Sequence, residues 1–204
     1  MDKIYRYHLN TNKKLYIFLL ATFTIGLIAG SLSSTFLNNA QSSELNNFLN
    51  KYINQIHQGQ YEIDKSSVSI SNVYQGIIIA VCGLFTFGIL FIFFLVGGKG
   101  FLMGFTINYA LLNLGGKGWL LVLCSLIPPN LIIIPTIFFQ SVIATRAILR
   151  RQEHKNIKRG FGNNKFYKEY TIFNLCALAL LLFSGIVEVY ISPLFFQLFL
   201  NIFY

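Results

Sequence analysis

Long uncharged stretches alternate with short charged ones along this chain of 204 residues. Asp, Glu, Lys and Arg are all absent from residues 15–43, 66–98, 100–116, 118–145 and 170–187. A helix needs roughly 20 apolar residues, and at least about 17, to cross a hydrocarbon layer about 30 Å thick. Each stretch reaches that length, so the pattern predicts an all-α, polytopic integral membrane protein.

The stretches predict five transmembrane helices, with bounds near residues 15–37, 73–96, 100–116, 119–145 and 170–191. The chain, 1–204, then forms a single membrane domain. Three other segments remain. We expect 38–72 to form an outer amphipathic loop, 146–169 a basic cytoplasmic loop, and 192–204 an outer interfacial tail. The first apolar stretch exceeds the 7–15 residues of a signal-peptide core. An uncleaved helix is therefore favoured over a signal peptide cleaved near Ala29-Gly30-Ser31.

Basic residues indicate the direction in which the helices cross the membrane, because cytoplasmic loops carry an excess of Lys and Arg. With the N-terminus in the cytoplasm, the outer segments hold only Lys51, Lys65 and Lys117, and every other Lys and Arg falls in a cytoplasmic segment. Lys99 then lies in a short cytoplasmic turn between the second and third helices. The C-terminus is therefore expected outside the cytoplasm.

Composition and motifs narrow the function. Hydrophobic residues make up 54% and charged residues 11% of the chain, against about 25% charged in an average soluble domain. The net charge of +9 comes from basic residues between apolar stretches, so we expect no nucleic-acid partner. Cys82, Cys124 and Cys176 lie inside apolar stretches without a CxxC pair, and no HExxH, GxSxG or nucleotide-binding loop is present. We therefore expect no enzyme, no metal site and no cofactor.

Small residues recur at helical spacing inside two of the apolar stretches. Gly26 and Gly30 form one GxxxG motif, and Gly100 and Gly104 form another. Glycines at this interval let the backbones of two membrane helices approach closely. The motifs therefore predict either packing within the chain, which we favour, or the interface of a homo-oligomer.

Prolines interrupt the fourth predicted helix. Pro128, Pro129 and Pro135 each remove a backbone donor and crowd the preceding turn, so this helix is expected to be kinked or broken near 128–135. Lipid cannot satisfy the carbonyl groups that are released, so the stretch should be buried or line a cavity, with Asn130 well placed to bond those carbonyls. Discontinuous helices also mark the sites of transporters, which keeps a transporter or channel as an alternative function.

Glu188 is a carboxylate inside the last predicted helix, 170–191. A charge at the centre of a membrane helix costs about 2.5–3.5 kcal/mol on insertion scales. Glu188 is expected roughly one turn from the outer end of its helix, where the cost is smaller. Two interpretations follow: the carboxylate reaches the outer interface, or it pairs with Lys117 on the same side of the membrane.

The outer segment 38–72 contains an amphipathic helix, whose apolar face includes Leu45, Phe48, Tyr52 and Ile56 at helical spacing. This face is interpreted either as resting on the outer interface or the bundle, or as docking an extracytoplasmic partner. The basic segment 146–169 is interpreted mainly as a topology signal, and it also attracts anionic lipid. Membrane lipids are therefore expected partners.

Several of these features occur together in one known family. They are Lys99-Gly100, Met103-Gly104-Phe105-Thr106, Gly116-Lys117-Gly118-Trp119, Leu126-Ile127-Pro128, the run from Asn130 to Pro135, and Glu188 with Ser192-Pro193. Together with the length of the chain, they resemble the stage II sporulation protein M family of endospore-forming bacteria.

The resemblance implies a non-enzymatic membrane scaffold that acts in engulfment during sporulation. In that family the protein is the membrane-embedded member of a complex with two peptidoglycan-degrading partners, stage II sporulation proteins D and P. It is thought to hold these hydrolases at the septal membrane. The resemblance therefore predicts extracytoplasmic hydrolases as partners and a septal or engulfing membrane as the location.

Overall fold

The computed structural model describes residues 2–57, 65–156 and 164–203, together with the side chains of most of them. Within these ranges the backbone is helical and contains no strand. The helices are α1 (Asp2–Thr35), α2 (Asn39–His57), α3 (Lys65–Cys82), α4 (Gly88–Leu114), α5 (Gly116–Leu121), α6 (Ile127–Asn156), α7 (Asn164–Ile186) and α8 (Ser192–Phe203). Two π-helical turns, η1 (Val122–Leu126) and η2 (Val187–Ile191), join α5 to α6 and α7 to α8.

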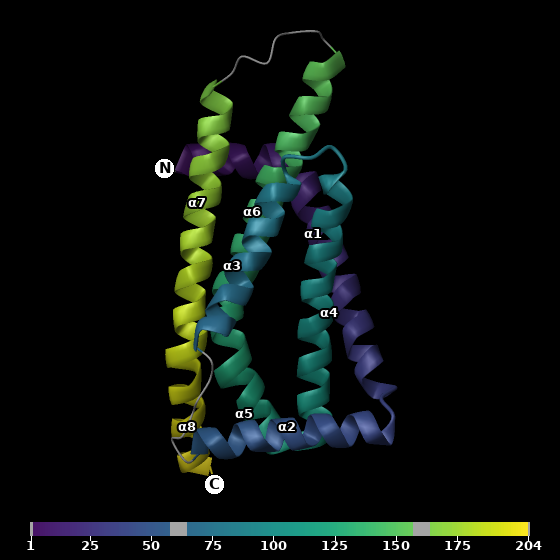
Figure 1. Ribbon diagram of the computed structural model, residues 1–204, viewed down its shortest axis with the longest axis vertical. Helices are drawn as coiled ribbons and strands as arrows, with labels where there is room; N and C mark the ends of the chain where they lie inside the picture. The colour runs from purple at the N-terminus through teal and green to yellow at the C-terminus, as the bar shows by residue number, and fades with distance from the viewer. Residues whose placement is uncertain (1, 58–64, 157–163, 204) are drawn as a thin grey trace.

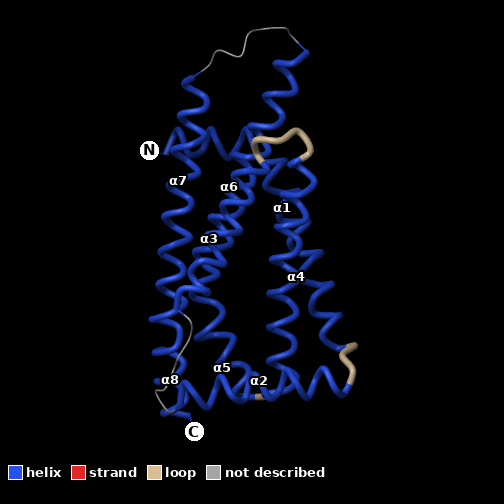
Figure 2. The backbone as a smooth tube through the Cα atoms, in the orientation of Figure 1, coloured by secondary structure: helices blue, strands red, loops and turns tan. Residues whose placement is uncertain are grey.

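The long helices stand side by side along one axis, and α2 crosses one end of them (Figure 1). The C-terminus lies at this end, which we call the α2 end. The N-terminus and the turn between α3 and α4 lie toward the other end, which we call the N-terminal end. Figure 2 shows that the loops of the described backbone are short and lie at these two ends.

Four helical segments are long and apolar enough to cross a membrane within the described ranges. They are Lys13–Thr35, Gly88–Leu114, Gly118–Gln152 and Tyr167–Gln197. The expectation of a polytopic, all-helical membrane protein is therefore confirmed. The number of spans differs from the predicted five, because the apolar part of α3, Ser71–Cys82, is too short to meet the same criterion.

The second predicted helix, 73–96, is wrong because the chain reverses inside it. Gly83 N donates to the carbonyl of Ile79 at 3.0 Å, and Gly88 N donates to that of Phe85 at 3.0 Å, which closes a turn between α3 and α4. A Cβ at Gly88 would collide with the backbone of Cys82, so the reversal needs glycine there. This turn carries no charge, which is why the charge pattern did not reveal it.

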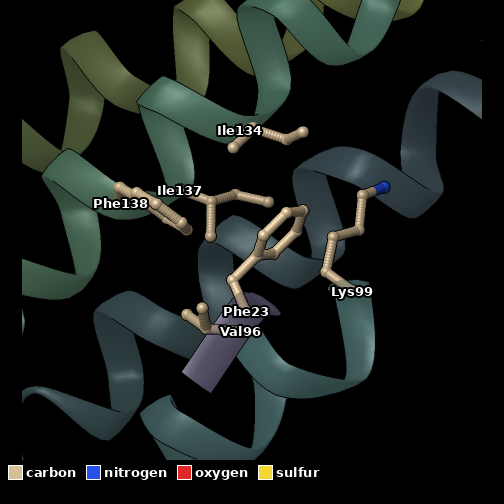
Figure 3. A pocket seen from close by; sticks show the side chains of 6 residues that line it. All are labelled: Phe23, Val96, Lys99, Ile134, Ile137 and Phe138. Carbon is tan, nitrogen blue, oxygen red and sulfur yellow. The ribbon is translucent and has the colours of Figure 1, made fainter. Parts of the chain in front are cut away.

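The boundary predicted at Lys99 is therefore also wrong. Lys99 lies inside α4 rather than in a cytoplasmic turn, and the predicted third helix, 100–116, is the second half of α4. The aliphatic part of Lys99 lines a small hollow between α1, α4 and α6, and its ammonium group points away from the apolar side chains there (Figure 3).

The proline-rich stretch does not break the fourth predicted helix. α6 runs without a break from Ile127 to Asn156 with Pro135 inside it. The irregular turns come just before the prolines instead. Ile127 N bonds to the carbonyl of Val122 ahead of Pro128 and Pro129, and Ser192 N bonds to that of Val187 ahead of Pro193. The wider π turn gives the proline ring room that an α turn lacks.

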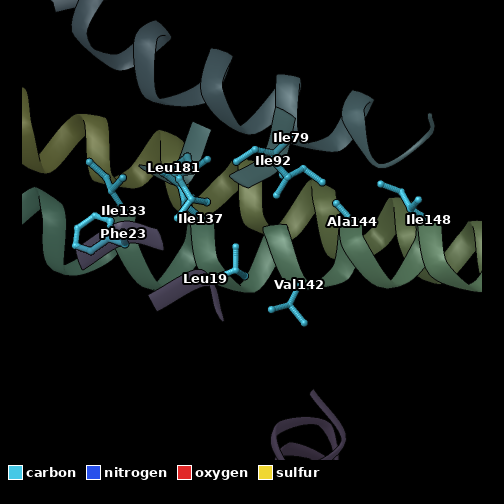
Figure 4. Packing of buried hydrophobic residues seen from close by; sticks show 11 residues of the cluster. Leu19, Phe23, Ile79, Ile92, Ile133, Ile137, Val142, Ala144, Ile148 and Leu181 are labelled. Atoms are coloured by element: carbon cyan, nitrogen blue, oxygen red, sulfur yellow. The ribbon is translucent and has the colours of Figure 1, made fainter. Parts of the chain in front are cut away.

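The core lies where α1, α3, α4, α6 and α7 meet. Its buried side chains are Leu19, Phe23, Ile79, Ile92, Val96, Ile133, Ile137, Val142, Ala144, Ile148 and Leu181, most of which are visible in Figure 4. A second cluster at the α2 end holds Ala110, Leu121, Val122, Cys124 and Phe196. The exposed residues of the same helices are also large and apolar, as a lipid-facing surface requires.

The two GxxxG motifs pack against each other. A Cβ on Gly30 or Gly104 would fall onto the backbone of Phe101 or Leu27 in the facing helix. Asn108 Nδ2 then donates to the carbonyl of Ser31 at 2.9 Å, which links α4 to α1 beside this contact. The glycines therefore serve packing within the chain in this structure.

This contact predicts opposite effects for two glycines of α4. Gly104→Ala should lower the free energy of unfolding by about 1–3 kcal/mol, because the added methyl group collides with backbone that cannot rotate away. Gly98→Ala is the matched control. In the described structure, no atom beyond its own stretch of helix lies within 4 Å of the Cβ it adds, and alanine favours helix over glycine by up to about 1 kcal/mol. Unfolding of both variants by SDS in mixed micelles measures the difference, and equal effects would contradict the proposed contact.

Candidate functional site

A cluster of three polar side chains joins α3, α4 and η2. Asn72 Nδ2 donates a hydrogen bond to Glu188 Oε2 at 2.8 Å, and Lys99 Nζ donates one to Asn72 Oδ1 at 3.4 Å. Asn72 is buried, whereas Lys99 and Glu188 are half-buried. An ammonium and a carboxylate thus meet on opposite sides of one amide, and we call these residues the Asn72 cluster.

The cluster lies deep between the membrane helices. At about 1.5 Å per residue, Lys99 is about 16 Å from the first residue of α4, which is half of a hydrocarbon layer about 30 Å thick. Ionisable side chains at this depth are costly, and they often mark functional sites. The depth and the two charges make the Asn72 cluster the leading candidate site.

An asparagine suits this position because its amide both donates and accepts. The NH₂ group satisfies a carboxylate, and the carbonyl oxygen satisfies an ammonium, so both neighbours keep a polar partner while charged. Among the side chains that the structure describes, Lys99 and Glu188 are joined through Asn72 and not by a direct contact. The cluster therefore depends on the residue at position 72.

A second polar layer lies closer to the N-terminal end and ties α3 to α6 and α7. Gln140 Nε2 donates to the carbonyl of Gly76 at 2.8 Å and to Asn174 Oδ1 at 3.0 Å. Tyr170 Oη donates to the carbonyl of Ala80 at 2.6 Å. Neighbouring side chains thus bond the backbone of α3 along its length.

Arg151 continues this pattern at the N-terminal end of the bundle. Its guanidinium donates to the carbonyl of Leu84, in the turn after α3, and lies 5.4 Å from the centre of the Tyr167 ring. The turn that the charge pattern missed is thereby held by a residue of the basic segment. Part of the basic segment 146–169 thus has a structural role.

The last membrane helix extends further beyond Glu188 than the sequence led us to expect. The helix continues past it through η2 into α8, so nine residues, about 13 Å, separate Glu188 from the end of the apolar segment at Gln197. Its carboxylate accepts a hydrogen bond from Asn72 Nδ2. The side chain of Lys117 lies outside the described residues, so its pairing with Glu188 stays a prediction.

Asn130 and the prolines of the fourth predicted helix lie apart from the Asn72 cluster in the contacts that the structure describes. Asn130 Nδ2 donates to the carbonyl of Leu126 at 2.8 Å, one turn back along its own helix. Its Oδ1 is buried and has no hydrogen-bond partner among the described residues. The amide thus satisfies a carbonyl beside the π turn η1, and its role there is local.

The predicted docking face on α2 is partly covered by the protein itself. Leu45 is half-buried, and Leu49 packs against the cluster around Phe196. Tyr109 Oη donates to the carbonyl of Ser42 at 2.7 Å, which fastens the start of α2 to α4. Phe48 remains 65% exposed. The side chains of Tyr52 and Ile56 lie outside the described residues.

Sequence reasoning missed Asn72, Lys99, Gln140 and Asn174 as site residues. Two signals in the sequence could have indicated them. The uncharged stretch 66–98 is too long for one span, and Asn and Gln side chains occur within apolar stretches. Within the described parts of the chain, no group of three His, Cys, Asp or Glu side chains could hold a metal ion.

The bridging role of Asn72 predicts energetic coupling. In a double-mutant cycle, Asn72→Ala and Glu188→Ala should show a coupling energy of about 1–2 kcal/mol, because their hydrogen bond has a charged acceptor. Asn72→Ala combined with Asn108→Ala is the control pair, since Asn108 bonds to α1 instead. Free energies of unfolding in mixed micelles measure both cycles. Additivity within about 0.3 kcal/mol for the Asn72–Glu188 pair would contradict the bond.

A comparison with protein families identifies the relatives of this chain. The model of the stage II sporulation protein M family matches residues 17–193, from α1 to the second residue of α8. No curated protein and no solved structure was found to match the chain. The family match spans most of the sequence and includes all three residues of the Asn72 cluster. The chain therefore belongs to the stage II sporulation protein M family.

Proposed function

We propose that this protein is a non-enzymatic membrane scaffold for engulfment during sporulation. Its N-terminal end faces the cytoplasm, and its α2 end faces the side where the cell wall lies. There it holds peptidoglycan-degrading partners resembling stage II sporulation proteins D and P at the septal membrane. The single observation that carries the proposal is the family match over residues 17–193.

The orientation draws support from the basic residues. Lys13 and Lys14 are the first two residues of the first apolar segment, Lys13–Thr35. Arg146, Arg150 and Arg151 lie in the last part of α6, toward the same end of the bundle (Figure 1). Excess positive charge favours the cytoplasmic side. Lys51, in contrast, belongs to α2 at the other end.

The surface that we propose for partners is the exposed side of α2 around Phe48. An aromatic side chain that is 65% exposed can supply contact area to a partner at the membrane surface. The opposite side of α2 rests on the bundle through Leu49, so the helix is a fixed platform rather than a free arm.

A photocrosslinking experiment tests this proposal. A photoreactive amino acid at Phe48 should capture a peptidoglycan hydrolase in sporulating cells, because Phe48 projects from the face assigned to partners. The same amino acid at Leu149, which is 39% exposed near the N-terminal end of the bundle, should capture none. Recovery of only lipid or of a second copy of the chain from the Phe48 position would contradict the scaffold proposal.

Transport is a second candidate function, and the Asn72 cluster favours it. Paired charges at mid-depth occur in ion and proton pathways. Purified protein in liposomes distinguishes the two, because a scaffold leaves ion flux at the level of empty liposomes. Flux above that level that is abolished by Glu188→Gln would favour transport.

A further inference from the structure

We propose that water reaches the Asn72 cluster from the α2 end of the bundle, along α3, while the N-terminal side stays sealed. The cluster would then be the floor of a hydrated, one-sided approach rather than a dry contact. This inference goes beyond the scaffold role. It rests on the proposed orientation only in that this orientation decides from which side of the membrane the water enters.

The apolar part of α3 is short, and the helix begins within the bundle. Its apolar part, Ser71–Cys82, covers about 18 Å, and its remaining residues are Lys65, Ser66, Ser67, Val68, Ser69 and Ile70. Figure 1 shows that α3 begins well short of α2, part of the way along α4. A polar helical turn therefore lies at a depth that the neighbouring helices cross as apolar segments.

Hydrocarbon cannot satisfy polar groups at this depth. Irregular or polar backbone segments inside the membrane are tolerated only where protein buries them or where they line a water-filled space. Protein does not completely bury the surroundings of Asn72, because Ser71 is exposed and Lys99 and Gln75 are half-exposed. Water is the remaining partner that solvates a hydroxyl, an amide and an ammonium together.

Charge supports the same conclusion. Lys99 can donate three hydrogen bonds, and the described side chains supply Asn72 Oδ1 at the long distance of 3.4 Å. Hydration lowers the cost of an ammonium at mid-depth, and local water penetration is one recognised way in which membrane proteins carry such charges. Water at the cluster thus allows both Lys99 and Glu188 to remain charged.

The approach is closed one helical turn beyond the cluster. A Cβ at Gly76 would meet Leu181, Leu178 and Gln140, so these side chains already pack closely on the α3 backbone. Leu181, Gln140 and Ile79 have no exposed surface. Gln140 also occupies the carbonyl of Gly76 at 2.8 Å. Water arriving from the α2 end therefore stops at this layer.

Cysteine accessibility in whole cells tests the proposal. Ser71→Cys is introduced into full-length protein whose Cys82, Cys124 and Cys176 are replaced by serine or alanine, and a charged, membrane-impermeant thiosulfonate is added outside. The matched control is Leu102→Cys. Leu102 is 64% exposed and lies three residues beyond Lys99 toward the α2 end of α4, so it is no deeper than the cluster but faces lipid. Asn47→Cys, exposed on α2, reports whether the α2 end faces outward.

Ser71→Cys should react about tenfold faster than Leu102→Cys, because thiols form reactive thiolate in water and not in hydrocarbon. Similar slow rates at both positions, with Asn47→Cys reactive, would overturn the proposal and show that lipid covers α3. If Asn47→Cys reacts only in inverted vesicles, the proposed orientation is wrong. The Ser71 and Leu102 rates are then compared in those vesicles, where the same difference is expected. If the cysteine-free background does not fold, the same single substitutions are made in the native sequence. The reaction rate of the native cysteines is then subtracted from the rate of each variant.

Discussion

The structure depends on one constraint: polar groups that enter the membrane must find polar partners there. α3 is the element that poses the problem, since its apolar part is only Ser71–Cys82. Neighbouring segments form hydrogen bonds with it. Glu188 accepts one from Asn72, Gln140 donates one to the carbonyl of Gly76, and Tyr170 donates one to the carbonyl of Ala80. A helix with too little apolar length is thus held by side chains of η2, α6 and α7.

A different interaction joins α1 to the rest. Between two helices that both face lipid, apolar side chains gain little by leaving hydrocarbon for one another, so close backbone contact and hydrogen bonds must supply the stability. Gly26, Gly30, Gly100 and Gly104 allow that contact, and Asn108 adds a hydrogen bond to Ser31. α1 and α4 therefore form one unit, and α3, α6 and α7 form the other, with the core side chains between them.

Charge and hydropathy predicted the membrane class, the helical fold and three of the spans near their observed positions, while the third predicted helix covers only the second half of α4. They failed between 66 and 98, because a turn flanked by Gly83 and Gly88 carries no charge and Lys99 looked like a loop residue. The prolines suggested a broken fourth helix, whereas α6 is continuous through Pro135. A π turn before Pro128 absorbs the strain that a break was expected to relieve. The Asn72 cluster joins residues 72, 99 and 188, which are distant in sequence, so only the fold could bring them together.

In a scaffold, this arrangement fixes the platform α2 relative to the membrane helices. The Asn72 cluster in turn fixes α3, which follows α2 in the chain.

Most of this depends on a hydrogen bond between Asn72 and Glu188 inside the bilayer. Solid-state NMR of the protein in lipid bilayers, with ¹⁵N in Asn and ¹³C in Glu side chains, measures this contact directly. We expect a dipolar coupling between the Asn72 amide nitrogen and the Glu188 carboxyl carbon that matches the N···O distance of 2.8 Å and disappears in Asn72→Leu. A spectrum without that coupling, or one unchanged in Asn72→Leu, would contradict it.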